Sequence, residues 1–115
     1  MVQPTSAMGN ARPPAALTAT QVIAGLASLD GWKLFGDGAD VAIEKTFQFK
    51  NFLRTLSFVN AVAYLAERHD HHPELLVQYS SCSVRWRTHD VQGISTLDLQ
   101  CAALVDALAA PPPSP

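Results

Sequence analysis

Three of the four histidines of the chain fall within four positions of one another, in the segment Glu67-Arg68-His69-Asp70-His71-His72-Pro73. The fourth lies further along, in Thr88-His89-Asp90. Histidine is the side chain whose ordinary pKa lets it take up and release protons near neutral pH, and neighbouring carboxylates can orient its ring. The pattern therefore indicates acid–base chemistry carried by this segment together with His89.

Two other interpretations of the cluster stay open on the residues alone. Histidines at a helix end can simply complement the helix macrodipole. His69 and His72 are three residues apart and could bind a metal ion on one helical face, with Glu67 or Asp70 nearby. However, Pro73 interrupts the helical register, and no HExxH or CxxC pattern accompanies the histidines. We therefore favour acid–base chemistry and expect no metal.

The segments around the histidines must form a scaffold that positions them. Capping-box spacing at Thr18/Gln21 and at Ser95/Asp98 predicts two helix starts, and Asn51 is a suitable cap for a longer helix. Alternating apolar residues predict strands, with a glycine-rich turn at 36–38 between the first two. The predicted helices are about 18–29, 51–69 and 95–108, and the predicted strands are 32–35, 41–49, 75–79 and 82–89.

This order, α-β-β-α-β-β-α, predicts an α+β two-layer sandwich in which a four-stranded antiparallel sheet has helices packed on one face. Lys45 is the exception in its strand, because it falls on the apolar face. Residues 17–108 should form one domain. The proline-containing segments 1–16 and 109–115 should be disordered tails, because they bury little apolar surface.

Composition excludes several classes of function. The chain has 115 residues and a formal net charge of −2, so it lacks the basic surface that nucleic acid binding requires. Its longest apolar run, 61–66, is too short to span a membrane, and its first residues do not resemble a signal peptide. Two cysteines without metal spacing fit a cytoplasmic protein. Only 16% of residues are charged, which suggests burial against further copies of the chain.

The histidine segment also resembles a known family. The string Glu67, His71-His72-Pro73, Tyr79, His89 and Asp98 is similar to the signature of the pterin-4a-carbinolamine dehydratases. The similarity also includes Trp32, the segment 47–52 and the stretch 93–95, so that it covers about residues 17–108.

The resemblance implies a hydro-lyase reaction: dehydration of 4a-hydroxytetrahydrobiopterin to the quinonoid dihydropterin, in tetrahydrobiopterin recycling, without a cofactor. It implies a catalytic set of His71, His72 and His89, in which His71 and His89 carry the protons and His72 mainly binds the pterin. It implies that Glu67 and Asp70 orient the rings. The residues implied to line the substrate site are Trp32, His71, His72, Pro73, Arg87, Thr88, His89 and Asp90.

The resemblance implies two further properties. Members of the family form dimers or tetramers, so we expect a homodimer or homotetramer. Some members act as transcriptional coactivators or assembly factors, so a binding module of the same fold is the alternative function. Ser80 and Arg87 depart from the residues common in the family, and we expect these departures to affect substrate affinity more than activity.

Overall fold

The computed structural model describes residues 15–110, and in that part of the chain three α-helices pack on a four-stranded sheet. The elements are α2 (Ala19–Leu26), β1 (Lys33–Phe35), β2 (Ala42–Gln48), α3 (Phe52–His69), β3 (Glu74–Val77), β4 (Ser81–Trp86) and α4 (Thr96–Ala109). Two short 3-10 helices, η1 (Gly38–Asp40) and η2 (His89–Val91), lie in the connections. The strand order is β1-β2-β4-β3, and every pair is antiparallel.

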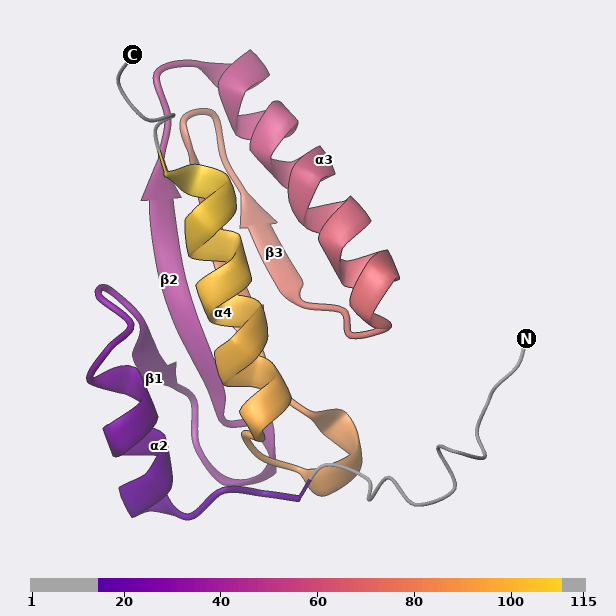
Figure 1. Ribbon diagram of the computed structural model, residues 1–115. Coiled ribbons are helices and arrows are strands. Elements are labelled where there is room, and N and C mark those ends of the chain that lie inside the picture. Colours follow the sequence, from indigo (N-terminus) through magenta and orange to yellow (C-terminus); the bar gives the residue numbers. More distant parts are fainter. Residues whose placement is uncertain (1–14, 111–115) are drawn as a thin grey trace.

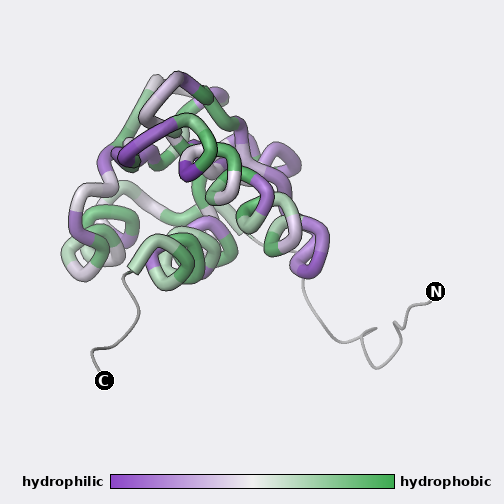
Figure 2. The backbone as a smooth tube through the Cα atoms, turned by 90° about the horizontal axis from the view of Figure 1, so that it is seen from above, coloured by the Kyte–Doolittle hydropathy of each residue, from purple (hydrophilic) through white to green (hydrophobic). Residues whose placement is uncertain are grey.

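The helices lie together on one side of the sheet, with α4 crossing in front of it and α3 beside α4 (Figure 1). The view from above shows the same separation into a helical layer and a strand layer (Figure 2). The predicted α+β two-layer fold is confirmed. Within residues 15–110, no helix combines the length and the apolar character needed to cross a bilayer.

The proposed tails fall largely outside the described residues. Segment 1–16 is described only at its last two positions, and segment 109–115 only at its first two. Ala109, which we assigned to the C-terminal tail, is the last residue of α4.

Each helix begins at a side chain that accepts a backbone hydrogen bond, as the sequence predicts. Thr18 and Gln21 form a reciprocal capping box at α2, with distances of 2.8 and 3.2 Å. The Asn51 side chain accepts the Arg54 amide at 2.9 Å at the start of α3. Ser95 begins α4 in a second capping box. Such caps contribute about 1 kcal/mol each because they satisfy amides that the helix leaves unpaired.

The register of the sheet separates a helix-facing side from an open side. Ile43 pairs with Trp86 and Phe47 with Cys82, and all four are buried towards the helices. The Lys45 side chain, which we noted on this apolar side, reaches Asp106 of α4 at 2.9 Å. This ion pair explains how a lysine is accommodated there.

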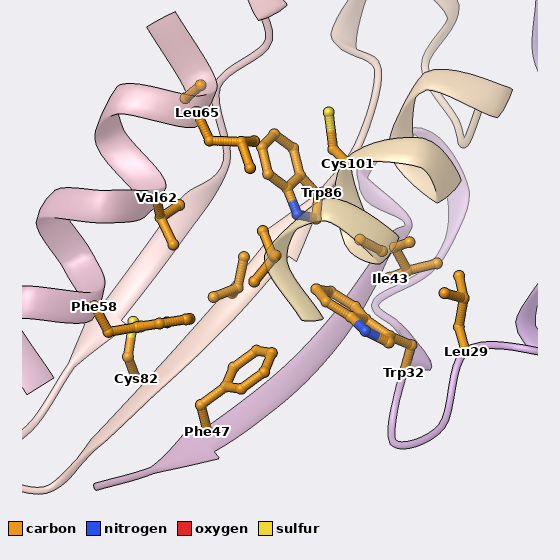
Figure 3. Packing of buried hydrophobic residues seen from close by; sticks show 14 of the residues in the cluster. Leu29, Trp32, Ile43, Phe47, Phe58, Val62, Leu65, Cys82, Trp86 and Cys101 are labelled. Carbon is orange, nitrogen blue, oxygen red and sulfur yellow. The ribbon is translucent and has the colours of Figure 1, made fainter. Parts of the chain in front are cut away.

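A continuous apolar core fills the space between the sheet and the helices (Figure 3). Trp86 is fully buried at its centre. Phe47 and Phe58 lie with their ring centroids 4.9 Å apart, joining β2 to α3. Cys82 and Cys101 are both free and buried. The core thus holds the ends of α3, β4 and α4 in fixed positions relative to one another.

The element boundaries differ most from the predictions at the end of the first helix and at the end of the last strand. The first helix ends at Leu26, and Leu29 lies in the turn that follows, where its amide bonds the Leu26 carbonyl. The last strand was predicted to reach His89, but β4 ends at Trp86 and His89 begins η2. The backbone turns because Thr88 bonds Gly93 within a tight loop instead of continuing the ladder.

Candidate active site

A Schellman-type cap ends α3, and His71 and His72 follow directly after it. Asp70 adopts the left-handed conformation, with φ of 48°. Its amide bonds the Glu67 carbonyl, and the His71 amide bonds the Ala66 carbonyl. This pattern satisfies the last helical carbonyls. Pro73 has no amide hydrogen and precedes β3, so His71 and His72 occupy the short link between helix and strand.

The pairing of β3 with β4 brings this link beside the end of β4. Glu74 pairs with Arg85, so the residues that precede β3 meet those that follow β4. The two segments line one cavity of about 210 Å³. The residues around it are Asp70, His71, His72, Arg87, Thr88, His89 and Asp90. The structure therefore gathers the three histidines singled out by the sequence around one open cavity.

The His71 ring is held by a buried carboxylate. Its Nε2 lies 2.6 Å from Oδ1 of Asp98, whose side chain is fully buried, while 11% of the His71 side chain is exposed. The other oxygen, Oδ2, accepts the Thr88 hydroxyl at 2.8 Å and the Ser95 amide at 2.9 Å. A carboxylate accepts hydrogen bonds, so the His71 Nε2 carries a proton, and in the neutral imidazole Nδ1 holds the lone pair.

The ring of His71 also stacks on the ring of Trp86. The two rings are stacked, with centroids 5.3 Å apart and an interplanar angle of 13°. Since Trp86 is fully buried in the core, it packs against one face of the imidazole and restricts its movement. His71 is therefore held in both position and tautomer.

His72 is held by a more exposed contact. Its Nε2 lies 2.7 Å from Oε2 of Glu67, with 56% of the His72 side chain and 76% of the Glu67 side chain exposed. Such a pair in solvent contributes little to stability. It can still restrict the imidazole, so Glu67 has the geometry expected of an orienting residue.

Of the other predicted residues, some lie at the cavity and others do not contact a histidine ring. His89 and Asp90 are exposed at the cavity, on η2. Within residues 15–110 no hydrogen bond joins the Asp70 carboxylate to a histidine ring, and its clear role is in the α3 cap. His69 is exposed at the last position of α3. No three His, Cys, Asp or Glu side chains in the described part of the chain are arranged to hold a metal ion.

Trp32 does not lie where the resemblance implied. It was expected at the pocket edge, but only 4% of it is exposed and it is absent from the cavity lining. Its Nε1 donates to both carboxylate oxygens of Asp106, each at 3.1 Å. Its ring packs against Phe47 in the core. In this chain Trp32 therefore connects the α2–β1 turn to α4.

Asp98 is a residue whose importance sequence reasoning underestimated. The predicted capping box accounts for one of its oxygens. The second oxygen holds His71, which is distant in sequence. The available signal was its position in the family string, because no local pattern points to a contact across 27 positions.

Comparison with known proteins shows the family of this chain. The family model for pterin 4 alpha carbinolamine dehydratase matches residues 15–108. A protein of Paracidovorax citrulli, named "Putative pterin-4-alpha-carbinolamine dehydratase", is 60% identical over 95 residues, or 83% of this chain and 82% of that protein. A relative of the same name in Bdellovibrio bacteriovorus is 47% identical over 98 residues, covering 82% of this chain and 78% of its own. The chain belongs to the pterin-4a-carbinolamine dehydratase family.

Two solved structures are similar in fold. A protein described as a transcriptional coactivator/pterin dehydratase from Brucella melitensis superposes with a TM-score of 0.77 and 34% identity, covering 83% of this chain and 99% of that one. A pterin dehydratase-like protein, described as a RuBisCO assembly factor in the alpha-carboxysome, has a TM-score of 0.60 at 24% identity, over 71% and 93% of the two chains. The second shows a shared fold alone.

Proposed function

We propose that this chain is a hydro-lyase that dehydrates 4a-hydroxytetrahydropterin to the quinonoid dihydropterin and water, without a cofactor or metal. The observation that supports this most directly is the cavity in which His71, His72 and His89 meet, with His71 fixed by a buried carboxylate. The reaction breaks the C4a–O bond and forms a C4a=N5 double bond. The departing hydroxide takes a proton from an acid, while the proton on N5 passes to a base, so protons balance.

The histidines suit these two proton transfers unequally. His71 presents Nδ1 as its free ring nitrogen, because Nε2 is bound to Asp98. His89 is exposed at the opposite segment of the cavity and can protonate the leaving hydroxyl. The two residues can exchange roles for the two stereoisomers at C4a, because they belong to the two different segments that line the cavity. His72 binds the pterin, and Glu67 restrains its ring. Backbone at Thr88 and Asp90, which line the cavity, and at Pro73, which is next to His72 but outside the lining, completes the proposed substrate site.

The direct test follows quinonoid dihydropterin from synthetic 4a-carbinolamine by absorbance, with and without the full chain. We expect acceleration that saturates with substrate and persists after treatment with a chelator. His69→Ala is the matched control, because this histidine is on the same helix end but outside the cavity. An uncatalysed rate in the presence of the intact, folded chain would contradict the proposal.

In its cellular setting, the proposed reaction converts the hydroxylated pterin left by aromatic amino acid hydroxylases into the quinonoid dihydropterin, which a separate reductase then returns to tetrahydrobiopterin, in the cytoplasm. We also propose a homodimer or homotetramer. The low charge fraction and exposed apolar residues of α3 support assembly, since Leu53 is 74% exposed and Tyr64 75%. Apolar side chains this accessible, gathered on one helix, are typical of surfaces between subunits. Analytical ultracentrifugation would measure the oligomeric state, and a monomer at micromolar concentration would contradict assembly.

A non-catalytic or dual-function binding module is the second candidate. The observation that favours it is the Brucella melitensis protein, whose description joins coactivator and dehydratase and which is 34% identical to this chain. A catalytic role predicts loss of carbinolamine turnover when His89 is replaced. A purely binding role predicts no turnover by the unaltered chain, so the same assay separates the two.

A further inference from the structure

Arg87 is the only Lys or Arg among the residues that line the histidine cavity in the described part of the chain. It follows β4 directly, and the β3–β4 register explains its position. Glu74 pairs with Arg85, so the same register continued by two residues sets His72 opposite Arg87. Arg87 thus lines the cavity opposite the His71-His72 link.

The guanidinium is held in place but has unused donors. Its Nη1 lies 3.1 Å from Oε1 of Glu74, and 24% of the Arg87 side chain is exposed. Its Nε is shielded from solvent and has no hydrogen-bond partner within residues 15–110. A guanidinium offers five N–H donors and no acceptor, so one ion pair leaves most of its capacity free. The exposed part of the guanidinium therefore has N–H donors that can bind a ligand oxygen in the cavity.

Besides the 4a-hydroxyl that leaves, the pterin ring carries one exocyclic oxygen, the 4-oxo group, on the carbon next to C4a. We propose that Arg87 is a specificity-determining residue that donates to this 4-oxo oxygen. A donor at O4 orients the ring so that the adjacent C4a faces the histidines across the cavity. It also excludes pteridines with a 4-amino group, because two donors would then face each other. This assignment rests on the proposed function, since it takes a pterin as the occupant.

The test compares two stable ligands that differ at one position. 6-Hydroxymethylpterin has the 4-oxo group, and 2,4-diamino-6-hydroxymethylpteridine has an amino group in its place. Both can be titrated into the full chain by fluorescence, at a pH where both rings are neutral. We expect the unaltered chain to bind the 4-oxo ligand at least about tenfold more tightly, the scale of one hydrogen bond to a charged group.

Arg87→Gln is the informative variant, because a carboxamide both donates and accepts. We expect it to bind the two ligands with affinities within about twofold of each other. Arg85→Gln is the matched control. Arg85 lies two residues earlier on β4 and pairs with Glu44, but it does not line the cavity. The control variant should keep the preference of the unaltered chain.

Turnover of the carbinolamine gives a second readout. Because the 4-oxo contact exists before and during dehydration, Arg87→Gln should raise KM by about tenfold and change kcat by less than about threefold. A structural role for Arg87 would instead lower the melting temperature and leave the ligand preference unchanged.

The outcomes separate this inference from the proposed function. If the unaltered chain turns over carbinolamine but binds both pteridines equally, the Arg87 assignment is wrong and the dehydratase proposal stands. Retention of the preference in Arg87→Gln would overturn the assignment in the same way. If the chain neither turns over carbinolamine nor binds either ligand, both fail together.

Discussion

His71 and Asp98 are 27 positions apart in sequence, yet Nε2 of one lies 2.6 Å from Oδ1 of the other. The same carboxylate caps α4 through its second oxygen. One buried side chain therefore couples the start of a helix to the tautomer of a histidine at the cavity. Because Ser95 and Thr88 supply the other donors, the carboxylate has little freedom to move.

Replacement of Asp98 should damage catalysis more than substrate binding. In Asp98→Asn the carboxamide can donate to the His71 ring as well as accept from it, so the Nδ1 lone pair is no longer guaranteed. We expect kcat to fall by about 10²-fold, the scale of lost general acid–base catalysis, with KM changed by less than about threefold.

Asp98→Asn needs a control for folding, because Asp98 also caps α4. Ser95→Ala removes a capping hydroxyl but leaves the Asp98–His71 contact in place. We expect it to lower the free energy of unfolding by about 1 kcal/mol in urea while largely preserving kcat. If both variants lose kcat in proportion to stability, Asp98 has only a structural role.

His89→Ala should lower kcat by about 10²-fold or more on synthetic carbinolamine, as expected for loss of a general acid or base. The side chain is exposed and η2 does not depend on it for a cap, so the melting temperature should change little. An unchanged kcat would remove His89 from the proposed acid–base pair. The comparison is made with each C4a stereoisomer, and the larger loss should occur with only one of them.

The elements of the fold could be predicted because their signals are local. The Thr18/Gln21 and Ser95/Asp98 capping boxes lie within single turns, and both are present in the structure. Alternation of apolar residues likewise identified the strands from neighbours in sequence. Helix and strand types were therefore correct, and only their ends shifted.

What could not be predicted depends on contacts between distant segments. Thr88 continues the alternation of β4, but its hydroxyl bonds Ser95 and Asp98, and the backbone turns away before His89. Trp32 matches a pocket residue of the family by type and spacing. In the structure, however, its Nε1 donates to Asp106 of α4 and the side chain is buried. Neither partner is visible to a local pattern, because each is brought near only by the packing of α4.

The contact of Lys45 with Asp106 predicts an asymmetric effect on stability. Asp106→Ala leaves a partly buried ammonium and the Trp32 Nε1 without their acceptor. We expect the free energy of unfolding to fall by about 1–3 kcal/mol in urea. Lys45→Met should be closer to neutral, because it places an apolar side chain on the apolar face and leaves the Trp32 bond intact. Equal losses for the two variants would show that the ion pair itself is the main contribution.

Cys101 predicts how stability responds to alkaline pH. Burial, and then the nearby charge of Asp98, raise the pKa of its thiol from 9.0 to about 11. The unfolded chain therefore loses the thiol proton first, between about pH 9 and pH 11, and binds fewer protons than the folded chain in that range. Stability contributed by this group is complete below pH 9 and is lost as the pH rises through the folded value. We expect urea midpoints to decline over this window, and Cys101→Ala to flatten part of the decline.

Iodoacetamide should label Cys101 at pH 8 only after unfolding, and rapid labelling of the folded chain would contradict the burial of this thiol.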